Sequence, residues 1–304
     1  MTYRADAGER ARVVPPSPST VDLHTHTSRS DGVLDPAALV EAAAAAGIRT
    51  LAITDHDTLA GLPAARAAAA RTGVHLIPGL EINTVADDAD GFRESELHIL
   101  GYGVDPEDGN LLAALEVQRE HRRLRFWRIV ERLDQLGLPV EETLRTMALD
   151  DHEDALGRPT VARALVAMQH ADSVDDAFHR LLARGQPAYV QREGLGPKGA
   201  IDAINGAGGI AVLAHFAEAG DRPSVVRDLM SLGMRGLEVY YRSFSADTVT
   251  KLETVARTHG LVATGGSDYH GDHETYAEAH AALWVPPGVA TAVATAIEDR
   301  ATNP

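Results

Sequence analysis

The sequence predicts an α/β fold in which one barrel-like domain is interrupted once by a helical insertion. From residue 20, short apolar runs alternate with alanine-rich helical stretches, which is typical of successive strands and helices around a parallel sheet. The alternation stops after Asp105, only helical patterns follow to about residue 185, and strand–helix units then resume. The length of 304 residues fits one large domain or two ordinary ones.

The first half of the barrel is expected to contain four strands. The first covers residues 21–26, and the helix after it begins at Pro36 and ends before Gly47, residue types that favour these two ends of a helix. A strand at 50–57 and a helix from about Leu59 to Thr72 come next. Two further strands are expected at 74–83 and 96–104.

The insertion is expected to begin with a long amphipathic helix at 111–136, followed by a break at 137–139 and two more helices, after Pro159 and near 174–184. Strand patterns return at 210–216, 237–241 and 261–270, and the apolar run 281–286 is the last strand-like segment before a closing helix. The predicted domains are a barrel (20–105 and 197–304) and a helical insertion (106–196). The charged, proline-containing residues 1–19 predict a disordered tail.

Composition excludes several classes of protein. The chain has 44 acidic against 28 basic side chains, a net charge of −16, which opposes tight binding to duplex DNA. Cysteine is absent, so a thiolate nucleophile and sulfur-bound zinc are excluded, and any metal site must use His, Asp or Glu. Without a long apolar span or a signal peptide, we expect a cytoplasmic protein with no membrane partner. The sequence does not predict an oligomeric state.

The predicted strand ends carry the side chains of a metal site. Residues at i and i+2 of a strand share a face, so His24 and His26 can meet at one point, with Asp31 nearby. A lone histidine is more often a packing or surface residue, but the carboxyl ends of barrel strands share one mouth. We therefore expect these three to converge with six others: His56, Glu81, His98, His215, Asp268 and His270. Asp55 and Asp57 are equally consistent with ligation and with support of ligands or helix capping.

These motifs together resemble the PHP (polymerase and histidinol phosphatase) superfamily, over roughly residues 21–286. The similarity is greatest to stand-alone bacterial phosphoesterases that act on nucleotide phosphates and short RNA. The resemblance implies a distorted (β/α)7 barrel holding two or three divalent metal ions, with the nine residues above as ligands and Glu81 as the bridge. Glu81, His215 and Asp268 are the expected catalytic groups.

The chain departs from the family pattern at three positions: Thr160 follows Arg158-Pro159 where relatives usually have His, Phe216 stands where Pro is common, and Tyr241 replaces a frequent His. These departures leave the substrate preference open.

Four residues are candidates to contact substrate. Arg122 and Arg125 can share a helix face with Arg132, although a solvated, glutamate-paired face is the favoured alternative. Arg158 lies before a proline-started helix whose N-terminus attracts anions, and its alternative is a plain helix-flanking role. Tyr241 is the fourth candidate.

The leading hypothesis is a metal-dependent phosphoesterase in which a metal-bridging hydroxide attacks phosphorus. Manganese, zinc and iron all suit the ligand set. The expected substrate is a small phosphorylated molecule, most plausibly a nucleoside 3′,5′-bisphosphate that loses its 3′-phosphate, or a short oligoribonucleotide. The alternatives are a histidinol-phosphate-type phosphatase, an amide hydrolase on the same barrel, a metal-binding regulatory module without catalysis, and a non-catalytic nucleic-acid-binding protein, which the acidic charge disfavours.

Overall fold

A computed structural model describes residues 19–85, 97–146, 156–271 and 275–302. These residues fall into two compact units, one formed by 19–116 with 195–302 and the other by 117–194. The insertion predicted at 106–196 contains the second unit. The predicted disordered tail lies outside the described residues except for Ser19. Along the part of the chain that is described, no helix is long and apolar enough to cross a membrane.

The first unit is built on a seven-stranded sheet that follows chain order, which confirms the predicted barrel. Its strands are β1 (Val21–Asp22), β2 (Thr50–Ile53), β3 (His75–Asn83), β4 (His98–Tyr102), β5 (Ile210–Leu213), β6 (Gly236–Tyr241) and β7 (Val262–Gly266). The segments that continue β1 and β7 also meet, because Leu23 N–H donates to Gly265 at 3.1 Å and His26 N–H donates to Tyr269 at 2.9 Å. The barrel is therefore nearly closed.

Strand β4 runs against its neighbours, although the sequence was interpreted as a series of parallel strands. Asn83 pairs with His98 and Gly79 with Tyr102, and β5 pairs with β4 in the same antiparallel sense. A parallel pair needs a long crossover connection, usually a helix, and the sequence between β3 and β4 predicts none. The reversal places the beginning of β4, with His98, beside the far end of β3. His98 thus starts its strand rather than ending it.

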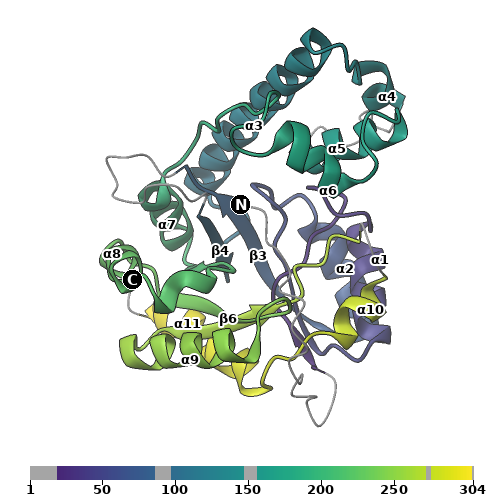
Figure 1. Ribbon diagram of the computed structural model, residues 1–304. Coiled ribbons are helices and arrows are strands. Elements are labelled where there is room, and N and C mark those ends of the chain that lie inside the picture. The colour runs from purple at the N-terminus through teal and green to yellow at the C-terminus, as the bar shows by residue number, and fades with distance from the viewer. Residues whose placement is uncertain (1–18, 86–96, 147–155, 272–274, 303–304) are drawn as a thin grey trace. The chain divides into compact units, whose positions relative to one another are not determined.

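Helices cover the outside of the sheet (Figure 1). Helices α1 (Pro36–Ala45), α2 (Leu62–Thr72) and α10 (Tyr276–Ala281) lie together, whereas α7 (Pro197–Gly206), α8 (Pro223–Ser231), α9 (Ala246–His259) and α11 (Gly288–Thr302) lie along the later strands. Helix α1 begins where the sequence predicts, because Asp35 caps it through the Ala37 N–H at 2.9 Å and Pro36 fits the first turn. Helix α2 begins at Leu62 rather than near Leu59.

The expected strand at 281–286 is wrong. Helix α10 ends at Ala281, and Leu283 and Val285 are buried in an irregular segment that packs against α11 and the sheet. Their apolar pattern reflects this burial. The edge of β7 already pairs with the continuation of β1, so no free edge remains for an eighth strand.

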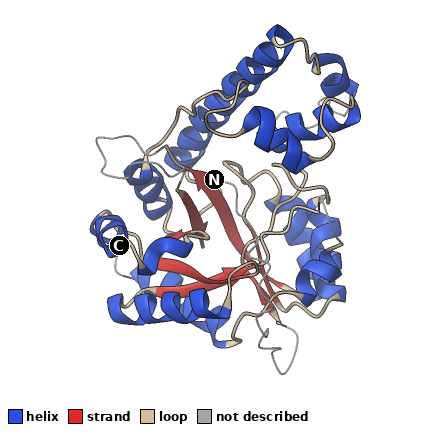
Figure 2. Cartoon of the chain, viewed as in Figure 1, coloured by secondary structure: helices blue, strands red, loops and turns tan. Residues whose placement is uncertain are grey.

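The second unit is helical in its described residues (Figure 2). Helix α3 (Gly109–Gln135) starts in the barrel unit, where Leu111 and Leu115 join the core, and continues into the second unit. The second unit also contains α4 (Glu141–Thr146), α5 (Arg158–Ala167), α6 (Val174–Ala177) and a π-helical turn at Phe178–Leu182. It has its own apolar core, which includes Phe126, Leu133, Leu165 and Leu182.

Candidate metal centre

The barrel brings all nine predicted metal ligands together. They form three groups in which the potential ligand atoms lie within 4.8 Å of one another: His26–Asp31–His56–His270, His24–His26–Glu81–Asp268, and Glu81–His98–His215. His26 belongs to the first and second groups, and Glu81 to the second and third. The groups are therefore parts of one continuous cluster.

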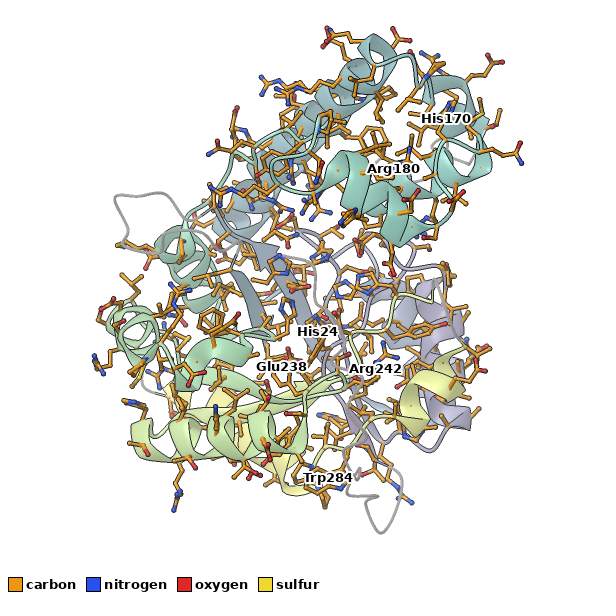
Figure 3. All side chains as sticks on the ribbon, in the orientation of Figure 1. His24, His170, Arg180, Glu238, Arg242 and Trp284 are labelled. Carbon is orange, nitrogen blue, oxygen red and sulfur yellow. The ribbon has the colours of Figure 1, made fainter. Side chains whose placement is uncertain are left out.

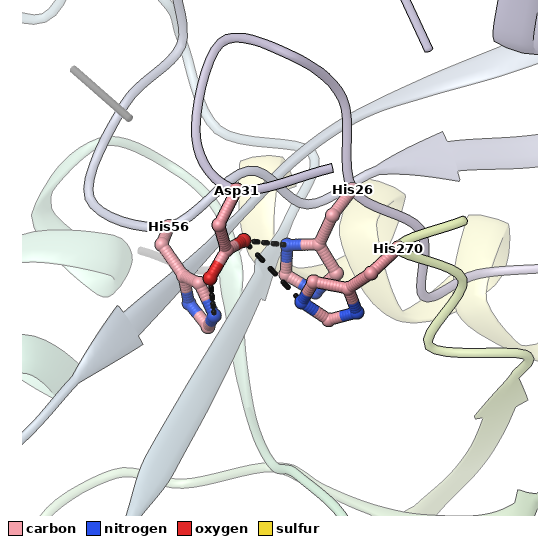
Figure 4. A group of neighbouring side chains, drawn as sticks. All are labelled: His26, Asp31, His56 and His270. Carbon is pink, nitrogen blue, oxygen red and sulfur yellow. Dashed lines mark ion pairs between the residues drawn. The ribbon is translucent and has the colours of Figure 1, made fainter. Parts of the chain in front are cut away.

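The first group surrounds Asp31 (Figure 4). Asp31 Oδ1 lies 3.3 Å from His270 Nε2 and 3.9 Å from His26 Nδ1, and its Oδ2 lies 3.7 Å from His56 Nε2. The rings of His26 and His270 stack with centroids 4.2 Å apart. Three imidazoles thus face one carboxylate, as a cation site built from nitrogen and oxygen donors requires.

Glu81 joins the other two groups through its two oxygens. Its Oε1 lies 2.8 Å from His98 Nδ1 and 3.3 Å from His215 Nε2. Its Oε2 lies 3.1–3.3 Å from a ring nitrogen of each of three histidines, His24, His26 and His56. A carboxylate with ligand partners on both oxygens has the arrangement of a bridge between neighbouring cations.

His26 provides the test of whether a metal fits. Its side chain is fully buried, yet neither ring nitrogen makes a well-directed hydrogen bond among the described residues. Nε2 lies only 3.1 Å from Asp268 Oδ1 and 3.3 Å from Glu81 Oε2. Buried polar atoms nearly always have partners, so two poorly satisfied nitrogens between carboxylates fit cations that bind imidazole and carboxylate ligands together.

The histidines and carboxylates of the cluster shift one another's pKa. Burial is the largest influence and favours the neutral forms, but the opposite charges outweigh it. The imidazoles of His56 and His24 hold the pKa of Glu81 well below its usual value. The carboxylates of Asp31 and Asp268 raise the pKa of His270 to about 10. The opposite charges thus favour protonated imidazoles at His24 and His270 beside ionised carboxylates at Asp31 and Glu81, an arrangement in which cations would replace protons.

Three residues at the strand ends have left-handed backbone conformations that are uncommon outside glycine. These are Asp57 (φ 55°), His215 (φ 28°) and Asp268 (φ 49°). Such conformations cost about 1–3 kcal/mol each and persist where the surrounding structure imposes them. Two of the three are predicted ligands, so the backbone is bent where it aims side chains into the cluster.

Two buried carboxylates outside the three groups hold the ligand-bearing segments. Asp55 accepts hydrogen bonds from the N–H and hydroxyl of Thr27, both at 2.7 Å, and from Ser30 at 2.8 Å, so it fixes the turn that leads to Asp31. These contacts favour support over ligation for Asp55. Asp57 Oδ1 accepts from the Asn83 N–H at 3.3 Å.

Asp22 has a similar place between the ends of β1 and β7. It accepts from the N–H and hydroxyl of Ser267 at 2.9 and 2.7 Å, and from the hydroxyl of Tyr276 at 2.8 Å. The role of Asp22 was not predicted from the sequence, nor was that of Glu238, which contacts two of the histidines. An ionisable residue inside an otherwise apolar strand is the signal that could have identified both.

Among the predicted substrate contacts, Tyr241 lies at the cluster. Its hydroxyl donates to Asp268 Oδ2 at 3.0 Å, and its ring is 5.6 Å from that of His215. The three arginines, Arg122, Arg125 and Arg158, belong to the second unit, and their contact with substrate stays a prediction.

Arg125 has a structural role within the second unit. It is buried, its Nε donates to the Val190 carbonyl at 2.8 Å, and its guanidinium lies 5.8 Å from the Tyr189 ring. The guanidinium of Arg158 lies 5.7 Å from the Phe178 ring. Of the departures from the family pattern, Thr160 is buried in α5 and Phe216 packs under Arg222.

Comparisons with known proteins agree with this geometry. The model of the PHP domain family matches residues 22–189. A 5′-3′ exoribonuclease, Rnm, of Salmonella typhimurium is 36% identical over 284 residues, which span 88% of this chain and 90% of that protein. A 3′,5′-nucleoside bisphosphate phosphatase of Chromobacterium violaceum is 33% identical over 266 residues, or 84% of this chain and 89% of the relative.

A solved structure from Bifidobacterium adolescentis, assigned as a metal-dependent phosphoesterase, superposes with a TM-score of 0.80 at 29% identity, over 92% of this chain and 97% of that one. The expectation of a hydrolase acting on phosphate esters, with divalent metals at its site, agrees with these proteins. The family model matches this chain, relatives align with it along most of its length, and its ligand cluster lies at the barrel mouth. This chain therefore belongs to the PHP domain family.

Proposed function

We propose that this chain is a phosphoesterase that removes the 3′-phosphate of a nucleoside 3′,5′-bisphosphate or shortens a small oligoribonucleotide from one end. Two or three divalent ions, of manganese, zinc or iron, would be held by the nine clustered ligands. The observation that supports this most directly is the sharing of His26 and Glu81 among three ligand groups. A set of neighbouring cations is the arrangement that suits in-line displacement at phosphorus.

Divalent ions bound in these groups would supply charge neutralisation for the phosphate and a water of lowered pKa as nucleophile. The residues of the chain determine where this chemistry takes place. Glu81 presents one oxygen to each side of the cluster. Asp268 directs Oδ1 toward His24 and His26, and the Tyr241 hydroxyl engages its Oδ2.

Three histidines of the cluster are partly exposed, His98, His215 and His270, whereas His24 and His26 are fully buried. Substrate would therefore approach the cluster at these partly exposed rings. The ring of Tyr241 lies tilted beside that of His215, and its hydroxyl keeps its proton because burial and the nearby carboxylates raise its pKa well above the usual value. Its one O–H donates to Asp268 Oδ2, so it would donate to a phosphate oxygen only by giving up that contact.

The substrate class rests on the relatives. One acts on nucleoside 3′,5′-bisphosphates and another on RNA, and each is aligned over more than four-fifths of this chain. A negative net charge of −16 is compatible with small nucleotides held by local cations, and it disfavours long polyanions. A cytoplasmic location, where such nucleotides occur, is part of this proposal.

The test is phosphate release from adenosine 3′,5′-bisphosphate by protein stripped with a chelator and reloaded with manganese, zinc or iron. We expect release only after reloading, and loss of release in His26→Ala. The matched control is His75→Ala, because His75 is exposed at the opposite end of β3 and should retain activity. Equal activity of His26→Ala and His75→Ala would contradict the proposal.

A substrate panel separates the alternatives. Histidinol phosphate, a 5′-phosphorylated trinucleotide, an aryl phosphate and a carboxamide are offered to the same metal-loaded protein. A preference for histidinol phosphate would replace the nucleotide proposal with a monoesterase, and cleavage of the amide alone would replace the phosphoesterase. Metal binding without turnover of any of these substrates would indicate a regulatory module.

A further inference from the structure

A buried glutamate of β6 contacts two of the predicted ligands without belonging to any ligand group. Glu238 is fully buried. Its Oε1 lies 3.0 Å from His24 Nδ1, and its Oε2 accepts a hydrogen bond from the backbone N–H of His215 at 2.7 Å. Figure 3 labels His24 and Glu238, which lie next to each other in the barrel interior. One carboxylate thus joins ligands from the continuation of β1 and from the end of β5.

The contact with His24 determines which ring nitrogen faces the cluster. A carboxylate oxygen accepts hydrogen bonds, so this contact is a hydrogen bond when Nδ1 of His24 carries the hydrogen that points to Glu238. Nε2 faces the other side, where Glu81 Oε2 and Asp268 Oδ1 each lie 3.3 Å away, and it would offer its lone pair to a cation bound there. This tautomer leaves Nε2 as the metal-binding atom.

The contact with His215 holds an unusual backbone. His215 has φ 28°, a conformation that costs energy for any residue with a Cβ. The short hydrogen bond from its N–H to Glu238 compensates part of that cost. The same bend directs the side chain so that Nε2 lies 3.3 Å from Glu81 Oε1.

We propose that Glu238 is a positioning residue of the metal centre, which sets the tautomer of His24 and the backbone of His215 at the same time. This inference rests on the proposed function, because it requires metal to bind at these histidines. Ligating histidines commonly donate their second N–H to a carboxylate, and loss of such a partner typically lowers metal affinity 10–100-fold. Here one side chain supports two ligands in two groups.

The sharpest variant is Glu238→Gln, which keeps size and shape. Both partners of Glu238 are donors, and an amide can accept at one end only. The NH2 group must then face either the His215 N–H or the Nδ1–H of His24, which either frees the backbone of His215 or reverses the tautomer of His24. The control is Glu253→Gln, an exposed glutamate that accepts from the Tyr240 hydroxyl at 2.9 Å.

The experiment measures metal affinity by competition with a chelator, and the His24 tautomer by nitrogen-15 NMR of the imidazoles in zinc-loaded protein. We expect Glu238→Gln to lower affinity about 10–100-fold, with Glu253→Gln at the wild-type value. Wild type should show His24 protonated at Nδ1. A wild-type affinity in Glu238→Gln, or His24 metallated at Nδ1 in wild type, would overturn the proposal.

The NMR measurement on wild type decides the question even if Glu238→Gln fails to fold, which melting curves in chelator would reveal. Failure of the proposed function is a separate result. If wild type binds no divalent ion, the metal centre and the positioning role are both rejected. If wild type binds metal and hydrolyses phosphate esters while Glu238→Gln matches it, only the positioning role is rejected.

Discussion

Substitutions of Asp55 test whether its carboxylate supports the metal centre or binds metal directly. Its carboxylate is buried and accepts three hydrogen bonds from Thr27 and Ser30, in the turn that carries Asp31. Two substitutions separate the roles. Asp55→Ala removes all three acceptor contacts, whereas Asp55→Asn keeps the shape, because Oδ1 can still accept from the Thr27 N–H and the Ser30 hydroxyl while the new NH2 group donates to Thr27 Oγ1.

The expected loss in free energy of unfolding follows from the three hydrogen-bond donors that Asp55 accepts from. Hydrogen bonds to a charged group contribute about 1.5–3 kcal/mol each, but two of these donors are hydroxyls that can rotate to other acceptors. Burial raises the pKa of Asp55, so desolvation offsets part of the remaining gain. We expect Asp55→Ala to lower the free energy of unfolding by about 2–4 kcal/mol and Asp55→Asn by about 1 kcal/mol. At roughly 2 °C per kcal/mol, the alanine variant should melt about 4–8 °C lower.

The assay combines urea unfolding in chelator with metal content after reloading. Asp55→Asn should retain the full metal content, while Asp31→Asn, which alters a predicted ligand, should lose part of it. If Asp55→Asn loses metal as strongly as Asp31→Asn, Asp55 is a ligand and the supporting role is wrong. If Asp55→Ala unfolds at the wild-type urea concentration, the three hydrogen bonds do not stabilise the turn.

Three further predictions concern pH, packing and the second unit. The pKa of His270 is raised from 6.5 to about 10, so its proton stabilises the metal-free fold fully below pH 6.5, and this contribution is lost as the pH rises toward 10. Chelator competition should therefore show metal affinity increasing between pH 6.5 and 10. An affinity that does not change with pH would contradict this prediction. A Cβ at Gly266 would lie 2.3 Å from the His24 backbone nitrogen, so Gly266→Ala should destabilise by about 2–4 kcal/mol in urea unfolding, whereas Gly206→Ala, with open space around it, should change stability by less than about 1 kcal/mol. Arg125→Met should lower stability by about 1–3 kcal/mol through the lost contact with the Val190 carbonyl, while metal content in the folded fraction stays at the wild-type level.

The sequence predicted the convergence of the site because barrel strands share a mouth. That rule places ligands at the carboxyl ends of strands. His24, His56 and His215 lie just beyond the ends of β1, β2 and β5, and Glu81 lies near the end of β3. His98 reaches the same mouth by another route, since β4 is reversed and contributes its first residue. The motif predicted the position of His98 at the mouth even though the assumed strand direction was wrong, and its role as a ligand stays a prediction.

The supporting roles of Glu238 and Asp22 could not be predicted from the residue pattern of the sequence. The contacts of Glu238 and Asp22 depend on which strands become neighbours, and periodicity along one strand does not give that information. The arginines of α3 illustrate a similar limit. Helical spacing places Arg125 on a face, but only packing reveals that this face is covered and that its Nε is bound to a carbonyl 65 residues away.

In the proposed metal centre, imidazoles and carboxylates from distant parts of the chain hold cations at the barrel mouth. The most direct measurement is anomalous scattering from crystals of the protein grown with manganese. We predict two or three peaks within coordination distance of the three ligand groups, with one peak on each side of Glu81. If no peaks appear there while His26 still lies close to Asp268 and Glu81, the metal centre is contradicted, and so is the hydrolase activity proposed for it.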